Sequence, residues 1–260
     1  MSISEISFQA LIRRTALFSG LFLLAACGEP EVARGINDPW EGSNRRTHEF
    51  NKGSDTGLIS RAAEAYVTVT PEPVVTGIAN FSDNLSTPQL VVNNLLQADL
   101  RGAFINSFRF VVNSTVGLGG FIDVATGAEI YEEDTDFGET LHVWGAREGA
   151  YLELPILGPS TERDAVGRVV DLFTNPLSYA LPKPEKYASP VASVAKKLGD
   201  RGRYSQTVGS VLYDSADSYA QTRSTYLQNR RYQLSGGTGA ADPYDDPYAA
   251  GDPYDDPYDQ

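Results

Sequence analysis

The segment from residue 99 to residue 117 limits the possible folds of this chain more than any other. Apolar residues recur there at helical spacing, Asp99 is placed to cap a helix, and Gly117 follows its last turn. Further apolar side chains lie on the other faces of this predicted helix, so no face is left for water. We therefore expect it to be deeply buried or to lie against lipid. The positions at helical spacing are Leu100, Phe104, Phe108, Val111 and Thr115.

The first 27 residues have the parts of a bacterial lipoprotein export signal. Arg13 and Arg14 precede an apolar stretch over residues 16–26, and small residues stand before Cys27. Cys27 is the only cysteine, so we expect it to carry the lipid anchor, and no disulfide can form within the mature chain. Gly28 stands where an inner-membrane retention signal usually has Asp, which favours sorting to the outer membrane.

Composition divides the chain into a signal peptide (1–26), a body (27–234) and a tail (235–260). The tail holds seven Asp, no Lys or Arg, and a repeated Asp-Pro-Tyr pattern, so we expect it to be disordered. The body is long enough for one domain and only moderately acidic, and it shows no basic nucleic-acid surface. No stretch of about 20 apolar residues follows the signal, so we predict no transmembrane helix.

Turn residues in the body separate segments with helical periodicity, which predicts a mostly α fold. Between residues 73 and 97 the sequence Ser86-Thr87-Pro88 interrupts the pattern, and we predict two short helices there. Thr161 and Asp164 have capping-box spacing and should open a helix that ends at Asn175-Pro176.

Three further elements are predicted near the end of the body. Ser189-Pro190 should begin a short helix, with Lys196, Lys197 and Gly199 suited to its other end. A last helix should run from about residue 215 to 233. Partial alternation over residues 151–156 predicts one short extended piece.

Several collinear motifs in the body resemble those of one known family. The run from Asn37 to Arg45, Asn-Asp-Pro-Trp-Glu-Gly-Ser-Asn-Arg, is similar to the opening motif of the MlaA (VacJ) lipoproteins. The other matching stretches follow in the family's order: Asn80–Leu85 with Pro88, Asn93–Gln97, Phe108–Phe110, Asn113–Thr115, Gly117–Ala125, Phe137–Leu141 and Leu154–Pro155.

The resemblance implies an outer-membrane lipoprotein of the Mla pathway. Such a protein removes phospholipids from the outer leaflet of the outer membrane through a polar channel and passes them to a periplasmic MlaC-like carrier, which maintains lipid asymmetry. The resemblance also implies a ring-like arrangement of amphipathic and apolar helices lying in one leaflet, on the periplasmic face, and an association with a trimeric porin. The alternative is a non-transporting envelope lipoprotein that scaffolds porins. Because a scaffold needs no polar passage, inward polar residues around a ring would distinguish the two.

The chain departs from the family pattern in two places. Ser43 stands where the family has an aromatic residue, and His48-Glu49 replaces less polar residues. The segment 126–136 is acidic where the family is more basic, so we expect carrier or porin contacts to differ there. Its acidic residues are Glu129, Glu132, Glu133, Asp134 and Asp136.

Arg109 is the sharpest candidate for a functional residue. An unpaired guanidinium inside an apolar helix costs free energy, so it must bind a carboxylate, carbonyls or water. Asp123 is a suitable counter-ion. The two residues could form a structural ion pair, or Arg109 could line a channel and meet a headgroup phosphate with its bidentate fork. Arg147 and Lys183 are weaker headgroup candidates, with a solvated surface role as the alternative.

Gly117, Gly119 and Gly120 are expected to permit a tight turn after the helix, and a hinge is the alternative. Nothing in the sequence indicates an enzyme, because no G-x-S-x-G or H-E-x-x-H pattern is present. The two histidines, His48 and His142, cannot by themselves supply a metal cluster, and we predict no catalytic residue, metal or cofactor. We expect His142, beside Trp144, to be a packed aromatic residue.

Overall fold

The computed structural model describes residues 36–236. The predicted signal peptide, the lipidation site at Cys27 and nearly all of the tail lie outside the described residues. Residues 38–236 belong to one compact unit. Helices make up most of it, which confirms the predicted class.

The described elements follow one another in a simple order. Their bounds are α2 (Glu41–Ser54), the π-helical η1 (Asp55–Ile59), α3 (Ser60–Val69), α4 (Glu72–Leu96), α5 (Leu100–Thr115), the 3-10 turn η2 (Leu118–Gly120), α6 (Val124–Gly127), α7 (Phe137–Val143), β1 (Tyr151–Leu154), β2 (Gly158–Thr161), α8 (Glu162–Thr174), α9 (Leu177–Ala180), η3 (Glu185–Tyr187), α10 (Ala188–Arg203), α11 (Ser205–Gly209), the π-helical η4 (Ser210–Asp214) and α12 (Ser218–Leu234).

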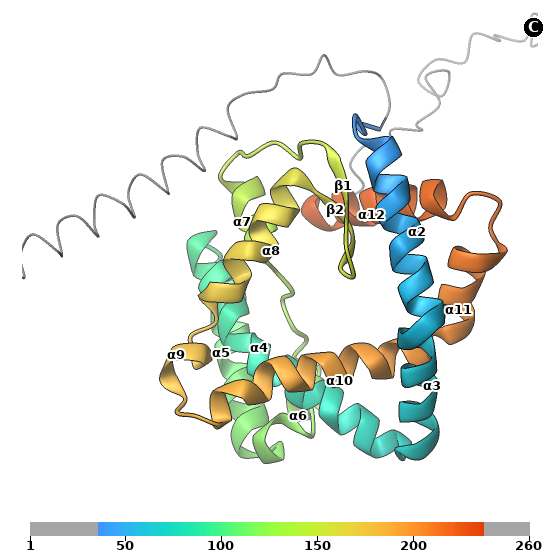
Figure 1. Ribbon diagram of the computed structural model, residues 1–260. Helices are drawn as coiled ribbons and strands as arrows, with labels where there is room; N and C mark the ends of the chain where they lie inside the picture. Colours follow the sequence, from blue (N-terminus) through green and yellow to red (C-terminus); the bar gives the residue numbers. More distant parts are fainter. Residues whose placement is uncertain (1–35, 237–260) are drawn as a thin grey trace, which may run out of the picture. The chain divides into compact units, whose positions relative to one another are not determined.

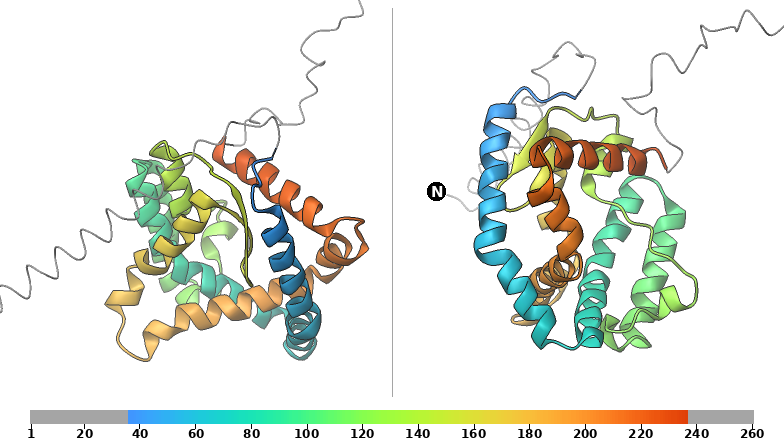
Figure 2. Two further views of the ribbon diagram at one scale, coloured as in Figure 1. Left: turned by 45° about the horizontal axis from the view of Figure 1, so that its top comes forward. Right: turned by 90° about the vertical axis from the view of Figure 1, so that its right-hand side faces the viewer.

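Within this unit the helices follow one another around a common centre (Figure 1). Helices α2 and α3 form one side, α10 runs along the next beside α4, helices α5, α7 and α8 form the third, and α12 lies across the fourth (Figures 1 and 2). The antiparallel β1–β2 hairpin pairs Tyr151 with Thr161 and contacts α2, α8 and α12. The first and last helices of the circuit are joined by ion pairs of Arg45 with Asp217 and of Arg223 with Asp38.

Helix α4 is one continuous helix, so the prediction of two short helices broken at residues 86–88 is wrong. Pro88 lies inside it and removes one backbone donor. The hydroxyls of Ser86 and Thr87 both donate to the carbonyl of Asp83, at 2.8 and 2.9 Å, one turn earlier. Because α4 packs along both α5 and α10, tertiary contacts carry the helix through a residue that would end an isolated one.

Helix α10 also differs from the prediction at both ends. It begins at Ala188, so Ser189 is not its cap, and it continues to Arg203. A Cβ at Gly199 would lie 2.9 Å from a methyl of Val75, so this glycine allows close packing against α4 and does not end the helix.

Three other predicted helices are confirmed. Helix α5 begins where Asp99 accepts a hydrogen bond from Gly102 N at 2.9 Å, and α8 begins where Thr161 Oγ1 accepts from Asp164 N at 3.2 Å. Helix α12 begins three residues after its expected start and ends one residue after its expected end. The extended piece beginning at Tyr151 is a strand, but its partner β2 was not predicted, because Gly158 and Pro159 hide any alternation.

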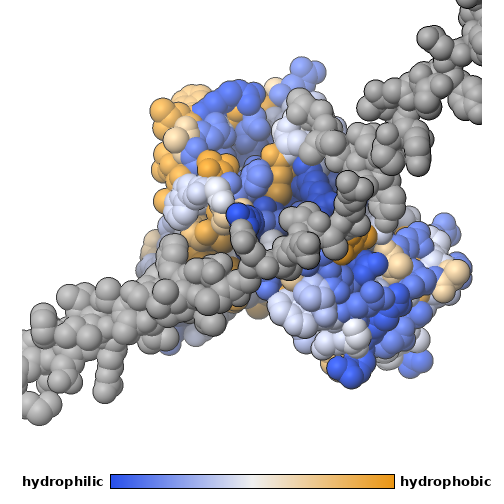
Figure 3. Space-filling view, turned by 90° about the horizontal axis from the view of Figure 1, so that it is seen from above, coloured by the Kyte–Doolittle hydropathy of each residue, from blue (hydrophilic) through white to orange (hydrophobic). Residues whose placement is uncertain are grey.

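The polarity of α5 is inverted relative to a helix of a water-soluble protein. Leu100 and Phe104 are each 72% exposed, whereas Asn106 is fully buried and Arg109 is 6% exposed. In the space-filling view, apolar residues gather toward the side on which α7 and α8 lie in Figure 1, while the opposite side is hydrophilic (Figure 3). Among residues 36–236, no helix combines the length and the apolar character needed to cross a bilayer.

Candidate functional site

Arg109 projects from α5 toward α6 and the segment that follows α6. Its Nη2 lies 3.1 Å from Asp123 Oδ2, and its Nη1 donates to Thr126 Oγ1 at 3.0 Å and to the carbonyl of Ile130. Its Nε has no partner within the described residues. The guanidinium is thus held by one carboxylate and two neutral oxygens, an arrangement that supports the structural ion pair.

Asp123 is fixed more firmly than Arg109. Besides the guanidinium, it accepts from Asn113 Nδ2 at 2.9 Å and, as the cap of α6, from Thr126 N at 3.0 Å. Burial alone would raise the pKa of this carboxyl, but hydrogen bonds from Thr126, Asn113 and Arg109 outweigh burial and lower it to about 2. Asp123 is therefore ionised at any physiological pH.

A polar cavity of about 210 Å³ adjoins this pair. Helix α4 supplies one wall, α5 another, and the acidic segment 126–136 closes the third side. The lining residues are Asn80, Asp83, Asn84, Thr87, Arg109, Asn113, Asp123, Thr126 and Glu132. All nine carry hydrogen-bonding side chains, so the cavity suits water or a polar group.

Two other carboxyls of the cavity have raised pKa values. Burial raises the pKa of Asp83 even though Lys196 of α10 pairs with it. Burial, with repulsion from Asp83, raises the pKa of Glu132 to about 7. Glu132 makes no hydrogen bond or ion pair with any other residue of 36–236, so it is the one carboxyl of this cavity without a directly bonded partner, although the charges of Arg109 and Lys196 act on it from a distance.

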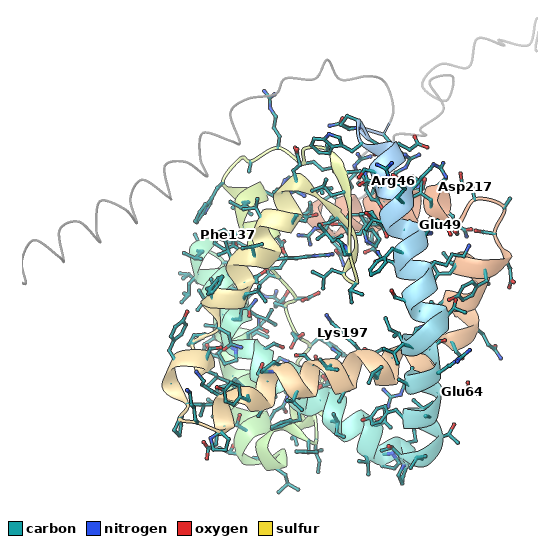
Figure 4. All side chains as sticks on the ribbon, in the orientation of Figure 1. Arg46, Glu49, Glu64, Phe137, Lys197 and Asp217 are labelled. Carbon is teal, nitrogen blue, oxygen red and sulfur yellow. The ribbon has the colours of Figure 1, made fainter. Side chains whose placement is uncertain are left out.

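The other predicted headgroup residues lie away from the cavity. Arg147 and Lys183 are both exposed, and neither belongs to the lining. Lys197 was not predicted as a site residue. It is exposed on α10, points into the space that the helices surround (Figure 4), and has no ion-pair partner among residues 36–236. Its sequence position near a helix end gave no signal of this orientation.

The three glycines after α5 form a tight turn against α4. Gly119 and Gly120 have φ values of +78° and +101°. A Cβ at Gly120 would lie 2.4 Å from Asn84 Cβ, and one at Gly117 would lie 2.2 Å from the carbonyl oxygen of Ile122. This geometry supports the turn, and the hinge stays an untested prediction.

A second buried polar group, which the sequence did not reveal, joins α2, β1 and α12. We name it the closure cluster: Asn44, His48, Glu153 and Ser218. His48 Nε2 lies 3.0 Å from Ser218 Oγ, and His48 Nδ1 lies 3.4 Å from Glu153 Oε1. Asn44 Nδ2 donates to the carbonyl of Tyr151 at 3.0 Å, and Asn44 Oδ1 accepts from Glu153 N at the same distance.

The order Ser–His–Glu in the closure cluster resembles that of a hydrolase triad. Ser218 and Glu153 are each 6% exposed and His48 is 2% exposed, so the hydroxyl is not open to a substrate. None of these residues lines the cavity described above. The cluster therefore fits a role in joining the first and last helices.

His142 is not a packed aromatic residue, contrary to the prediction. It is exposed, and its Nδ1 lies 3.4 Å from Arg163 Nη1. The neighbouring Trp144 makes an aromatic contact, edge-on to Phe137 with ring centroids 5.7 Å apart, although it is itself 54% exposed.

Comparison with known proteins gives a consistent result. Residues 36–233 match the family model described as MlaA lipoprotein. The chain is 32% identical over 243 residues to the intermembrane phospholipid transport system lipoprotein MlaA of Escherichia coli K12, covering 92% of this chain and 94% of that protein. The Haemophilus influenzae protein of the same description is 31% identical, with coverage of 86% and 90%.

A solved structure supports the same relationship. It is described as the structural basis for maintenance of bacterial outer membrane lipid asymmetry, and it shares 32% identity with this chain. The match has a TM-score of 0.65 and covers 76% of this chain and 98% of the solved one.

Proposed function

This chain belongs to the MlaA lipoprotein family, and we propose that it transports phospholipid between membranes as a lipid-anchored protein of the bacterial outer membrane. In this proposal it takes phospholipid from the outer leaflet of the outer membrane. It passes the lipid through a polar channel to an MlaC-like periplasmic carrier, beside a trimeric porin. The proposed role is transport and not catalysis.

The inverted polarity of α5 is the observation that carries the proposal. Exposed apolar side chains are costly in water but stable in hydrocarbon, at about 25 cal/mol for each Å² of apolar surface. Phe104 is 72% exposed and Val111 57%, and on α8 Leu172 is 74% exposed and Phe173 66%. A unit with such an exterior, and with no spanning helix among residues 36–236, fits one leaflet better than water or a full span.

The polar interior supports transport over scaffolding. A charged headgroup pays a large desolvation cost in hydrocarbon, and a polar passage lowers that cost. The cavity beside Arg109 and Asp123, together with the inward-pointing Lys197, supplies polar groups of the kind such a passage needs. A protein that only scaffolds porins would need none of them.

The test is the amount of phospholipid in the outer leaflet of cells that lack this protein. We expect it to rise on deletion and to return to normal with the wild-type chain. Phe104→Asp should fail to restore it at equal abundance, because a charge would enter the apolar exterior. Gln228→Asp, at an exposed position of α12, is the matched control and should restore it. An unchanged outer leaflet in the deletion strain would reject transport and favour the scaffold.

A further inference from the structure

The cavity between α4, α5 and the segment 126–136 presents mainly hydrogen-bond acceptors. We name it the acceptor cavity and define it by the nine lining residues given above. Three of these are carboxylates, Asp83, Asp123 and Glu132. Asn84 adds a neutral acceptor: its Oδ1 has no hydrogen-bond partner within the described residues, although the residue is only 4% exposed. An unsatisfied buried amide oxygen indicates that a donor is missing from this place.

The three carboxylates differ in how fully they are compensated. Asp123 has Arg109, Asn113 and Thr126, as described above, and Asp83 has Lys196. Glu132 has no such partner among residues 36–236. The lining thus contains one carboxyl that would gain a counter-ion and one neutral oxygen that would gain a donor.

A primary ammonium group has the chemistry that this lining calls for. It carries one positive charge and three N–H donors, and it makes charge-assisted hydrogen bonds to carboxylates. An anion would face three carboxylates and only one unpartnered donor of Arg109, its Nε, because Nη1 and Nη2 already bind Asp123, Thr126 and the carbonyl of Ile130. Within the described part of the chain, no group of three or more His, Cys, Asp or Glu is arranged to hold a metal ion.

We propose that the acceptor cavity binds the primary ammonium group of an aminophospholipid headgroup, with Glu132 as its counter-ion and Asn84 Oδ1 as its neutral acceptor. This inference rests on the proposed transport of phospholipid and adds a headgroup preference to it. A phosphoethanolamine headgroup ends in such an ammonium, whereas a phosphoglycerol headgroup does not. The chain would therefore favour the ethanolamine lipid over the glycerol lipid.

The preference should depend on pH through Glu132. Asp83 on α4, Arg109 on α5, Lys196 on α10 and Asp134 on its own segment are the charged groups that act on this carboxyl. Since its pKa is about 7, Glu132 is ionised above neutrality and neutral at pH 5. Affinity for the ethanolamine lipid should thus fall as the pH drops from 8 to 5, while affinity for the glycerol lipid should not.

The experiment measures binding of short-chain lipids to the full-length chain in detergent by calorimetry. The probes are dihexanoyl phosphatidylethanolamine, dihexanoyl phosphatidylglycerol and free ethylammonium. We expect the wild type to bind the ethanolamine lipid about tenfold more tightly at pH 8, as one charge-assisted hydrogen bond implies. Glu132→Gln should abolish that difference. Glu133→Gln is the matched control and should keep it, because Glu133 pairs with the exposed Arg101.

Each other outcome overturns a different statement. If both lipids bind the wild type equally, the ammonium site is rejected while lipid transport stands. If neither lipid binds at any pH, the proposed function fails. If ethylammonium binds in a Glu132-dependent way while the two lipids bind alike, the cavity is a site for free amines and the headgroup assignment is overturned. A loss of preference in Glu133→Gln equal to that in Glu132→Gln would reject Glu132 as the counter-ion.

Discussion

Replacing Asp123 with Asn should lower the free energy of unfolding by about 2 to 3 kcal/mol, because Arg109 would keep a buried charge without its counter-ion. Apart from the bond that Thr126 Oγ1 donates to Asp123 Oδ2, the other contacts can be kept. Asn is as good a helix cap as Asp, and its amide oxygen can still accept from Thr126 N. Arg109 would keep its hydrogen bonds to Thr126 and to the carbonyl of Ile130.

Two features of the structure set this magnitude. The pKa of Asp123 is about 2, against 3.8 for an unperturbed Asp, and a tenfold change in proton affinity corresponds to ~1.4 kcal/mol, so the native contacts of this carboxylate contribute about 2.5 kcal/mol. The Arg109 side chain is 7% exposed but that of Asp123 is 28% exposed. The loss should therefore stay below the ~3–5 kcal/mol that follows when one partner of a fully buried pair is removed.

The assay is urea unfolding of the full-length chain in detergent, followed by the helical circular dichroism signal. Arg109→Met combined with Asp123→Asn should recover about half of the loss, because no charge then remains buried. Since the pKa of Asp123 is lowered in the folded state, its stabilisation is complete above about pH 5 and disappears as the pH falls through about 4 to 2. A loss under about 0.5 kcal/mol for the single variant, or no recovery in the double variant, would refute the reasoning.

Two further predictions concern backbone and cap geometry. Gly120→Ala should cost about 2 kcal/mol or more, because φ is +101° there and the new methyl would meet Asn84, whereas Gly127→Ala, with nothing within 4 Å of its Cβ, should change stability by less than about 0.5 kcal/mol. Equal unfolding midpoints for the two variants would contradict this. Thr161→Ala should cost about 1 to 2 kcal/mol by removing the cap of α8, and Thr161→Ser should restore most of it; a serine variant as unstable as the alanine one would show that the cap is not the cause.

Local patterns predicted the elements whose ends are set locally. The starts of helices α5 and α8 were predicted correctly because Asp99 and Thr161 each accept from a backbone N–H three residues later. Such a short separation can be recognised in the sequence. Pro88 misled the prediction because its effect on α4 is decided by neighbouring helices. The π-helical segments η1 and η4 have no sequence pattern that distinguishes them from ordinary helix.

The candidate site was only partly predictable for the same reason. Arg109 and Asp123 are 14 residues apart, within one supersecondary unit, so a buried charge and its nearby mate could be paired from sequence. His48 is separated from Glu153 by 105 residues and from Ser218 by 170, and no local pattern brings those residues together. In the sequence, Glu132 is only one of several acidic residues in the segment 126–136. Its lack of a partner becomes visible once α4 and α5 are placed beside it.

The composition of the interior explains why local prediction worked better for helices than for packing. Among the described residues, 20 polar or charged side chains are buried against 11 apolar ones. Polar side chains thus occupy most of the fully buried positions. Directional bonds between them, such as that of Asn106 Nδ2 to Asn94 Oδ1 at 2.8 Å, therefore help to fix the packing beside apolar burial. If lipid covers the apolar exterior, removing the lipid should loosen these buried hydrogen-bond networks. Phe104 and Leu100 would then face water, and they would be more stable in the interior, where they would displace buried asparagines.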